Sequence, residues 1–189
     1  RNNAYKMNLF PIRKGKILFQ LMVSFTFAFN DGDATLIVTG NVHGQLDPCG
    51  WPKKPLGGLS RKYTTLKNIK KEGLAPIVLD AGDLLFTSSV LADSNRESET
   101  FRASSILDDN MNYPFDAINV GKYELAGGLD LLQKLINKTK SNFISANLRD
   151  SNSGRLLFNP YKIIERNGII FGIIGLTDMV SGEVDGVLQ

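Results

Sequence analysis

Cysteine, histidine and tryptophan each occur only once among the 189 residues of this sequence. The single cysteine, Cys49, excludes an internal disulfide and leaves three interpretations: a small loop residue with a free thiol, an intermolecular partner, or a metal ligand. Internal repeats, low-complexity tracts and blocks of like charge are also missing. With 42% hydrophobic and 22% charged residues, the composition is that of a folded domain with a sizeable core and not that of a disordered chain.

Acidic residues are missing from positions 1–28, which carry the basic residues Arg1, Lys6, Arg13, Lys14 and Lys16. The formal net charge of the whole chain is +3, so the remaining residues together have a net charge of −2. The basicity therefore belongs to the N-terminus and not to the domain, and we expect no nucleic-acid partner.

The N-terminal residues have the pattern of an export signal. A basic stretch, MNLFPIRKGK, precedes the apolar run ILFQLMVSFTFAF, and Ala28 stands at a suitable cleavage position. The apolar run is short for a membrane-spanning helix, and its alternative interpretation is a buried strand or helix. We predict that residues 1–28 are a signal peptide or N-terminal membrane anchor. The protein would then be exported and be periplasmic, extracellular or membrane-anchored.

Residues 29–189 would form the domain. Because the sequence starts before Met7 and ends with the residues GEVDGVLQ, we expect this domain to be truncated at its C-terminus. Short β-rich runs alternate in it with longer amphipathic segments, whose apolar residues recur at helical spacing. We predict strands at 34–40, 76–83, 115–121 and 142–148, and helices at 57–73, 96–111 and 124–139. This alternation indicates βαβ units and a mostly parallel sheet, which is an α/β fold.

The C-terminal part follows a different pattern. Residues 161–176 hold two apolar runs on either side of Asn167-Gly168, a dipeptide typical of tight β-hairpins. Residues 150–155 have the composition of a polar loop. The expected order is therefore βαβαβαβ followed by a hairpin.

Polar residues follow each predicted strand of the parallel sheet. Asn41 and His43 follow the first strand, Asp83 the second, residues 121–124 the third and Asn147 the fourth. In a parallel sheet the carboxyl ends of the strands share one edge, where ligands bind. Oxygen and nitrogen donors from separate loops suit a divalent cation, and phosphoester hydrolases use such ions. Each residue alone also has a simpler interpretation, as an exposed histidine or a Gly-Asp turn.

Seven sequence blocks occur in the order and spacing of a known family: TGNVHGQLD, GGLSRK, VLDAGDLLF, FDAINVGKYEL, GLDLLQKLI, SANL and PYKIIERNGIIFGIIGLTD. Over about residues 34–178 the chain resembles the calcineurin-like metallophosphoesterases, specifically their 5'-nucleotidase-type branch. The resemblance implies the N-terminal half of an α/β/β/α sandwich. It also implies a two-metal phosphoester hydrolase that is commonly exported and acts on nucleotides or related small phosphoesters.

The resemblance assigns metal ligands in two of these blocks. The family's first block has Asp-x-His, whose two ends ligate one metal. This sequence has Asn41-Val42-His43, so an uncharged amide replaces the carboxylate. The family's Gly-Asp, whose carboxylate bridges both metals, is intact at Asp83. We therefore expect His43, Asp83 and Asn41 to be the metal ligands.

A third block departs further from the family. The family's Gly-Asn-His-Glu reads Gly121-Lys122-Tyr123-Glu124 here, which replaces both the asparagine that ligates the second metal and the histidine that assists catalysis. A protonated lysine cannot ligate a metal, so Lys122 is a candidate substitute for the charge of one, unless it extends into solvent. Tyr123 is a candidate acid–base group, poorer than histidine because its reference pKa is about 10. Glu124 and Cys49 are further candidates.

The family's remaining histidine ligands lie farther along the chain than these residues. Because His43 is the only histidine, the 189 residues cannot complete a two-metal site by themselves. The cofactor that the resemblance implies is a divalent ion, Mn, Zn, Mg or Ca, with reduced occupancy or none as the alternatives.

Three functions from different classes are consistent with these residues. The first is a metal-dependent phosphoester hydrolase of the 5'-nucleotidase type with an altered metal site, in which a metal-activated water attacks phosphorus. The second is a catalytically inactive, exported binding or accessory module that retains the fold. The third uses Cys49 for redox chemistry or for binding a soft metal. The resemblance favours the first.

Overall fold

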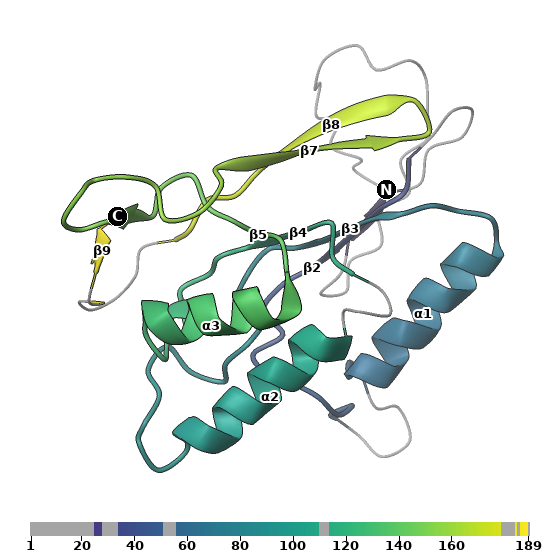
Figure 1. The fold of residues 1–189 in the computed structure, drawn as a ribbon. Helices are drawn as coiled ribbons and strands as arrows, with labels where there is room; N and C mark the ends of the chain where they lie inside the picture. Colours follow the sequence, from purple (N-terminus) through teal and green to yellow (C-terminus); the bar gives the residue numbers. More distant parts are fainter. Residues whose placement is uncertain are drawn as a thin grey trace, which may run out of the picture.

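The computed structural model describes residues 25–27, 34–50, 56–109, 114–178, 184 and 186–188. Its central sheet has five strands in the order β1-β2-β3-β4-β5 (Figure 1). The bounds of these strands are Phe25–Phe27, Leu36–Thr39, Ile77–Asp80, Ala117–Asn119 and Phe143–Ile144. Strands β2 to β5 run parallel, and β1 pairs with β2 in the antiparallel direction. The prediction of an α/β fold with a mostly parallel sheet is confirmed.

Three helices connect the parallel strands: α1 (Leu59–Lys71), α2 (Arg96–Asp109) and α3 (Leu129–Thr139). All three lie on the same side of the sheet, and the hairpin of β7 and β8 lies on the other side (Figure 1). The helices predicted at 57–73 and 96–111 are confirmed to within two residues at each end.

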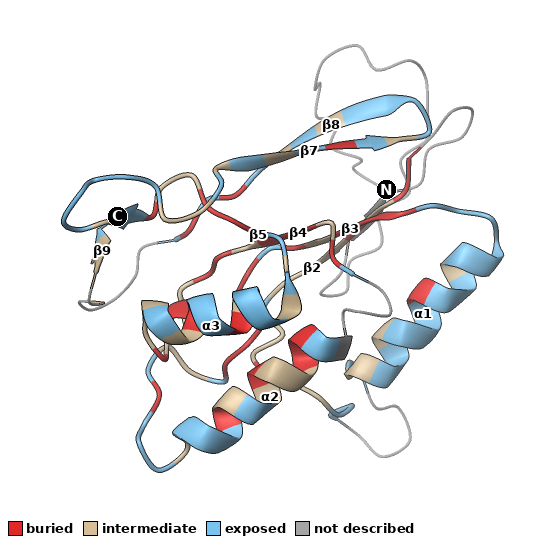
Figure 2. Ribbon diagram, in the orientation of Figure 1, coloured by how far each residue is buried: buried red, intermediate tan, exposed pale blue. Residues whose placement is uncertain are grey.

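The core lies between the sheet and the three helices. Ile37, Val78 and Ile118 point from neighbouring strands into one apolar cluster, and helix residues such as Leu66 and Leu132 complete it. Because side chains alternate along a strand, the neighbouring residues of these strands face the hairpin instead. Burying one such aliphatic side chain contributes about 1.5–3 kcal/mol to folding. Figure 2 shows this buried layer along the strands and the inner faces of the helices.

The helix predicted at 124–139 is wrong in its first turn. The structure has a short 3₁₀ helix, η1 (Tyr123–Leu125), and α3 begins only at Leu129. Gly128 between them has a φ of 87°, in the left-handed region that favours glycine, and a Cβ atom at Gly127 would collide with the side chain of Leu131. The two glycines therefore end one helix and precede the next.

The strand predicted at 142–148 is also wrong in its second half, because β5 ends at Ile144. The N–H of Ser145 donates to the carbonyl of Asn159 at 3.0 Å, and the N–H of Ala146 donates to that of Gly175 at 2.8 Å. Strand β5 therefore pairs with β4 over only two residues, because the N–H groups of Ser145 and Ala146 donate to carbonyl groups of the C-terminal segment.

The hairpin at the C-terminal end is confirmed. Strands β7 (Tyr161–Arg166) and β8 (Ile169–Ile174) pair antiparallel across Asn167 and Gly168, whose φ angles of 51° and 77° suit a two-residue type I′ turn. The Arg166 guanidinium lies 2.7 Å from the Asp116 carboxylate at the start of β4, which ties the hairpin to the sheet. Much of the hairpin is exposed (Figure 2).

A further pair of short strands was not predicted. Strand β6 (Arg149–Asp150) pairs antiparallel with β9 (Val187–Leu188), so the first residue of the polar loop predicted at 150–155 belongs to a strand. Residues 151–153 do form a turn.

Most of the predicted export signal lies outside the described residues. Within positions 1–28, only residues 25–27 are described, as strand β1. Across the parts of the chain that the structure describes, no helix combines the length and apolarity needed to cross a membrane. The signal peptide therefore stays a prediction.

Candidate functional site

The loops that follow β2 and β3 are joined by backbone hydrogen bonds beyond the ends of the strands. The N–H of Asn41 donates to the carbonyl oxygen of Gly82 at 2.9 Å, and the N–H of His43 donates to that of Asp83 at 2.8 Å. Both loops leave the same edge of the sheet because the strands are parallel. The structure therefore brings Asn41, His43 and Asp83 together, although they come from sequence blocks about 40 residues apart.

Unfavourable backbone angles concentrate in these two loops. Among the described residues other than glycine, five have a positive φ, and three of the five are Asn41 (53°), His43 (52°) and Asp83 (56°). This conformation costs most residues with a side chain roughly 1–2 kcal/mol, and asparagine, aspartate and histidine adopt it more readily than other residues do. The hydrogen bonds between the loops maintain it here. Residues held in such conformations cluster at functional sites.

The loop after β4 completes the cluster. The backbone N–H of Tyr123 donates to Oδ1 of Asp83 at 2.9 Å, so the carboxylate is held between the second and third loops. A Cβ atom on Gly82 would lie 2.8 Å from the backbone nitrogen of Gly121, closer than real side chains approach. The two loops can pack this tightly only because both positions are glycine.

Glu124 is a structural clamp between these loops. Its side chain is completely buried, Oε1 accepts the N–H groups of Leu84 (2.6 Å) and Leu85 (3.0 Å), and Oε2 accepts those of Asp83 (2.8 Å) and Gly121 (2.7 Å). Burial raises the pKa of Glu124 to about 7, although the donated hydrogen bonds oppose this rise. The sequence placed Glu124 among the site candidates, and the structure gives its carboxylate a positioning role.

His43, Tyr123 and Lys122 form a stack at the same edge. The rings of His43 and Tyr123 meet edge to face, with centroids 4.6 Å apart and planes at 76°. The Lys122 ammonium lies 5.5 Å from the centroid of the Tyr123 ring, within the range of a cation–π interaction. Lys122 is half-buried and forms no ion pair with Asp83 within the described structure. The ammonium therefore neither extends freely into solvent nor neutralises the carboxylate directly.

Asp80, at the end of β3, holds the loop that carries Asp83. It was not predicted as a site residue from the sequence. It is buried, accepts the hydroxyl of Thr39 at 2.5 Å through Oδ2, and accepts the N–H of Gly82 at 2.8 Å through Oδ1. Burial raises the pKa of the Asp80 carboxyl above its usual value. The signal for this role was a carboxylate ending an otherwise apolar strand, three residues before Asp83.

Comparisons with known proteins show which proteins this chain is similar to. No family model matches the chain. The UshA protein of Salmonella pullorum is 30% identical over 124 residues, which are 64% of this chain and 21% of that protein. A 5'-nucleotidase precursor from Thermus thermophilus superposes with a TM-score of 0.59 at 26% identity, over 76% of this chain and 28% of that one. The relationship to the 5'-nucleotidase-type phosphoesterases is confirmed.

The fold alone is also shared with the calcineurin-like phosphoesterase YfkN of Bacillus subtilis. That structure matches with a TM-score of 0.56 at 21% identity, over 76% of this chain and 48% of that one. The chain spans about a quarter of the length of the curated 5'-nucleotidase relatives that it matches first. It is therefore related to a phosphoester hydrolase family through one part of those longer proteins.

The two-metal site of the 5'-nucleotidase type does not fit the described residues. They contain no group of three or more histidine, cysteine, aspartate or glutamate side chains close enough to hold a metal ion. The edge has one carboxylate (Asp83), one imidazole (His43) and one amide (Asn41), and the resemblance predicts that Lys122 stands where the family has a ligand. These donors suit one divalent ion and not a pair.

Two other residues that were predicted from the sequence contact different parts of the chain. Asn147 is held by Thr177, since its Oδ1 accepts the Thr177 N–H at 2.8 Å and its Nδ2 donates to the Thr177 carbonyl at 2.7 Å. Cys49 is exposed, and its backbone pairs with Leu56 in both directions at 2.8 and 2.7 Å. Asn147 is thus a connector to the C-terminal segment. Nothing in the described surroundings of Cys49 supports a redox or soft-metal role.

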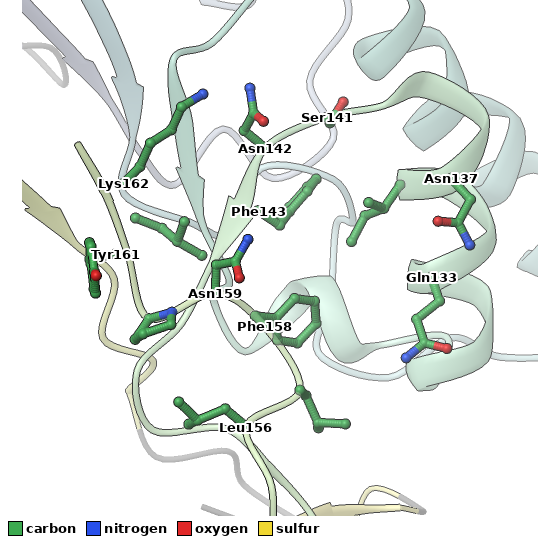
Figure 3. Close-up of a pocket in the computed structure, with 14 residues that line it drawn as sticks. Gln133, Asn137, Ser141, Asn142, Phe143, Leu156, Phe158, Asn159, Tyr161 and Lys162 are labelled. Carbon is green, nitrogen blue, oxygen red and sulfur yellow. The ribbon is translucent and has the colours of Figure 1, made fainter. Parts of the chain in front are cut away.

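Neither of two cavities in the described structure is lined by Asn41, His43 or Asp83. One of about 830 Å³ opens between α3, β5 and residues 156–162, where Gln133, Asn137 and Phe158 line it (Figure 3). Another, of about 300 Å³, separates the sheet from β8 and includes Asp80 and Asn119.

Proposed function

We propose that this chain carries part of the site of an exported phosphoester hydrolase of the 5'-nucleotidase type, with a nucleotide or related small phosphoester as substrate. The observation that supports this most strongly is the convergence of the loops at the sheet edge. Backbone hydrogen bonds of 2.9 and 2.8 Å join Asn41 and His43 to the loop of Asp83, and all three residues keep a left-handed backbone. Residues held in such conformations cluster at functional sites.

The residues at this edge would have distinct roles. His43, Asp83 and the amide oxygen of Asn41 would hold one divalent ion, which would polarise the phosphoryl group and acidify a bound water. Lys122 would place a positive charge against the phosphate oxygens, because its ammonium is half-buried beside the Tyr123 ring. Asp80 and Glu124 would act only by holding the loops in position.

The test is the release of inorganic phosphate from nucleoside 5'-monophosphates by the full-length protein, supplied in turn with Mn²⁺, Zn²⁺, Mg²⁺ or Ca²⁺. We expect ion-dependent release, and we expect His43→Ala and Asp83→Ala each to lower the rate at least about 100-fold. The matched control is Asp93→Ala, because Asp93 is an exposed aspartate outside the cluster. Equal rates for all four proteins would refute the proposed site.

The second candidate is an inactive binding or accessory module, and the replacements at Lys122 and Tyr123 favour it. It predicts that nucleotides bind without turnover in the presence of any of the four ions. Calorimetric titration with a nucleoside 5'-monophosphate, run beside the phosphate assay, separates the two functions. Binding that His43→Ala abolishes, together with no phosphate release, would select the module.

Export is the remaining part of this proposal, supported by the basic and apolar pattern of residues 1–28. Fractionation of cells that express the full-length protein, with and without these residues, tests it. We expect the exported fraction to require them, and an unchanged distribution without them would contradict export by this signal.

A further inference from the structure

We propose that Lys122 and Tyr123 close the second metal position of the family in this protein, so that the site accepts at most one divalent ion. The inference rests on the same edge site as the proposed function, but it concerns ion binding and does not require turnover. It follows from the side chains that surround Asp83, the carboxylate that would otherwise bridge two ions.

The first step concerns the carboxylate itself. Oδ1 of Asp83 accepts the backbone N–H of Tyr123 at 2.9 Å, and Oδ2 has no hydrogen bond within the described residues. Oδ1 is thus turned toward the loop that would supply the ligand of the second ion. That ligand is absent, because the residue directly before Tyr123 is Lys122, whose ammonium has no lone pair to offer a metal.

The second step concerns the stack. Tyr123 lies edge to face against His43 with centroids 4.6 Å apart, and the Lys122 ammonium lies 5.5 Å from the Tyr123 ring. A second ion near this loop would have to displace the stacked side chains and would meet a positive charge at short range. Two positive charges at such separations repel strongly wherever solvent access is reduced, as it is around these half-buried residues.

The backbone of the loop that carries Lys122 and Tyr123 is held in place. Lys122 and Tyr123 lie between Gly121 and Glu124 in the sequence. The Glu124 carboxylate accepts the N–H of Gly121 at 2.7 Å, and it also accepts three N–H groups of the Asp83 loop, so both ends of this short segment are held. Gly121 itself packs so closely on Asp83 and Glu124 that a Cβ atom has no room there. The loop therefore cannot swing away to admit an ion while the clamp holds.

The test restores the family's residues in the full-length protein with the double variant Lys122→Asn/Tyr123→His. After removal of bound metal, Mn²⁺ is titrated into both proteins in a calorimeter. We expect at most one site in the unmodified protein, and in the double variant an additional site or at least tenfold tighter binding. Lys134→Asn is the matched control, because Lys134 is an exposed lysine of α3, and it should behave as the unmodified protein does.

Two sites in the unmodified protein, with affinities like those of the double variant, would overturn the inference. Thermal unfolding of each variant checks that it is folded, and the stoichiometry of the unmodified protein decides the question even where the double variant is unstable. Failure of the proposed function is a separate result. If the protein releases no phosphate and binds one ion or none, the proposed function fails and the inference about the second metal position still holds.

Discussion

Glu124 makes the stability of this domain depend on pH in a direction opposite to that of most carboxylates. Burial raises its pKa from 4.5 to about 7, so the folded state holds a proton that the unfolded state has already released. A carboxyl with a raised pKa contributes stability that is fully present below pH 4.5 and is lost as the pH rises through about 7. At about 1.4 kcal/mol for each pH unit of difference, the full loss is about 3 kcal/mol.

The assay is urea-induced unfolding of the full-length protein followed by circular dichroism, at pH values from about 5 to about 8. We expect the free energy of unfolding to fall by about 2–3 kcal/mol over this range on account of Glu124. The raised pKa of Asp80 adds to the loss in the same direction. A loss of this size is a large fraction of the roughly 5–15 kcal/mol by which domains are stable.

Glu124→Gln provides the reference, because glutamine has nearly the same size and does not titrate. Its NH2 group cannot accept the two N–H groups that one carboxylate oxygen accepts, so the comparison uses the change of stability with pH and not the absolute stability. The variant should lose about 2–3 kcal/mol less than the unmodified protein between about pH 5 and pH 8. The difference between the two curves reports Glu124 together with its electrostatic effect on Asp80, because the two carboxyl groups interact. Parallel curves, or stability that rises with pH only in the unmodified protein, would show that the folded state does not raise the pKa of Glu124.

Two glycines give further predictions, measured by urea unfolding at fixed pH. Gly121→Ala should lower the free energy of unfolding by about 2–4 kcal/mol, because the added methyl group would overlap Asp83 and the clamp; a loss below about 0.5 kcal/mol would show that the loops are loosely packed. Gly168→Ala should cost only about 1 kcal/mol, because its φ of 77° is unfavourable for alanine while open space surrounds it; a loss as large as that of Gly121→Ala would contradict this contrast.

Local sequence patterns were sufficient where one segment determines its own structure. The hairpin followed from Asn167-Gly168, whose two left-handed residues favour a tight turn in any context. Helix α1 followed from apolar residues at helical spacing, because the helix buries one side against the core, and α2 followed from the alternation of strands with helix-length segments. The same alternation of elements placed Asn41, His43 and Asp83 at a common edge of the sheet.

The errors arose where distant groups determine the structure. Strand β5 is short because Asn159 and Gly175 provide acceptors from the C-terminal segment, and no local pattern at residues 142–148 reveals this. The sequence predicted Glu124 as a candidate site residue, yet its carboxylate oxygens accept backbone N–H groups about 40 residues away in the sequence. Whether Lys122 meets Asp83 or an aromatic ring likewise depends on packing between loops.

The number of metal ions that the full-length protein carries is determined by elemental analysis after purification without chelators. We propose that Asp83 and His43 at the sheet edge hold one divalent ion, while Lys122 and Tyr123 close the second metal position. We therefore expect no more than one ion per chain, at a position that Asp83→Ala empties. Two ions per chain, both lost in Asp83→Ala, would contradict this proposal.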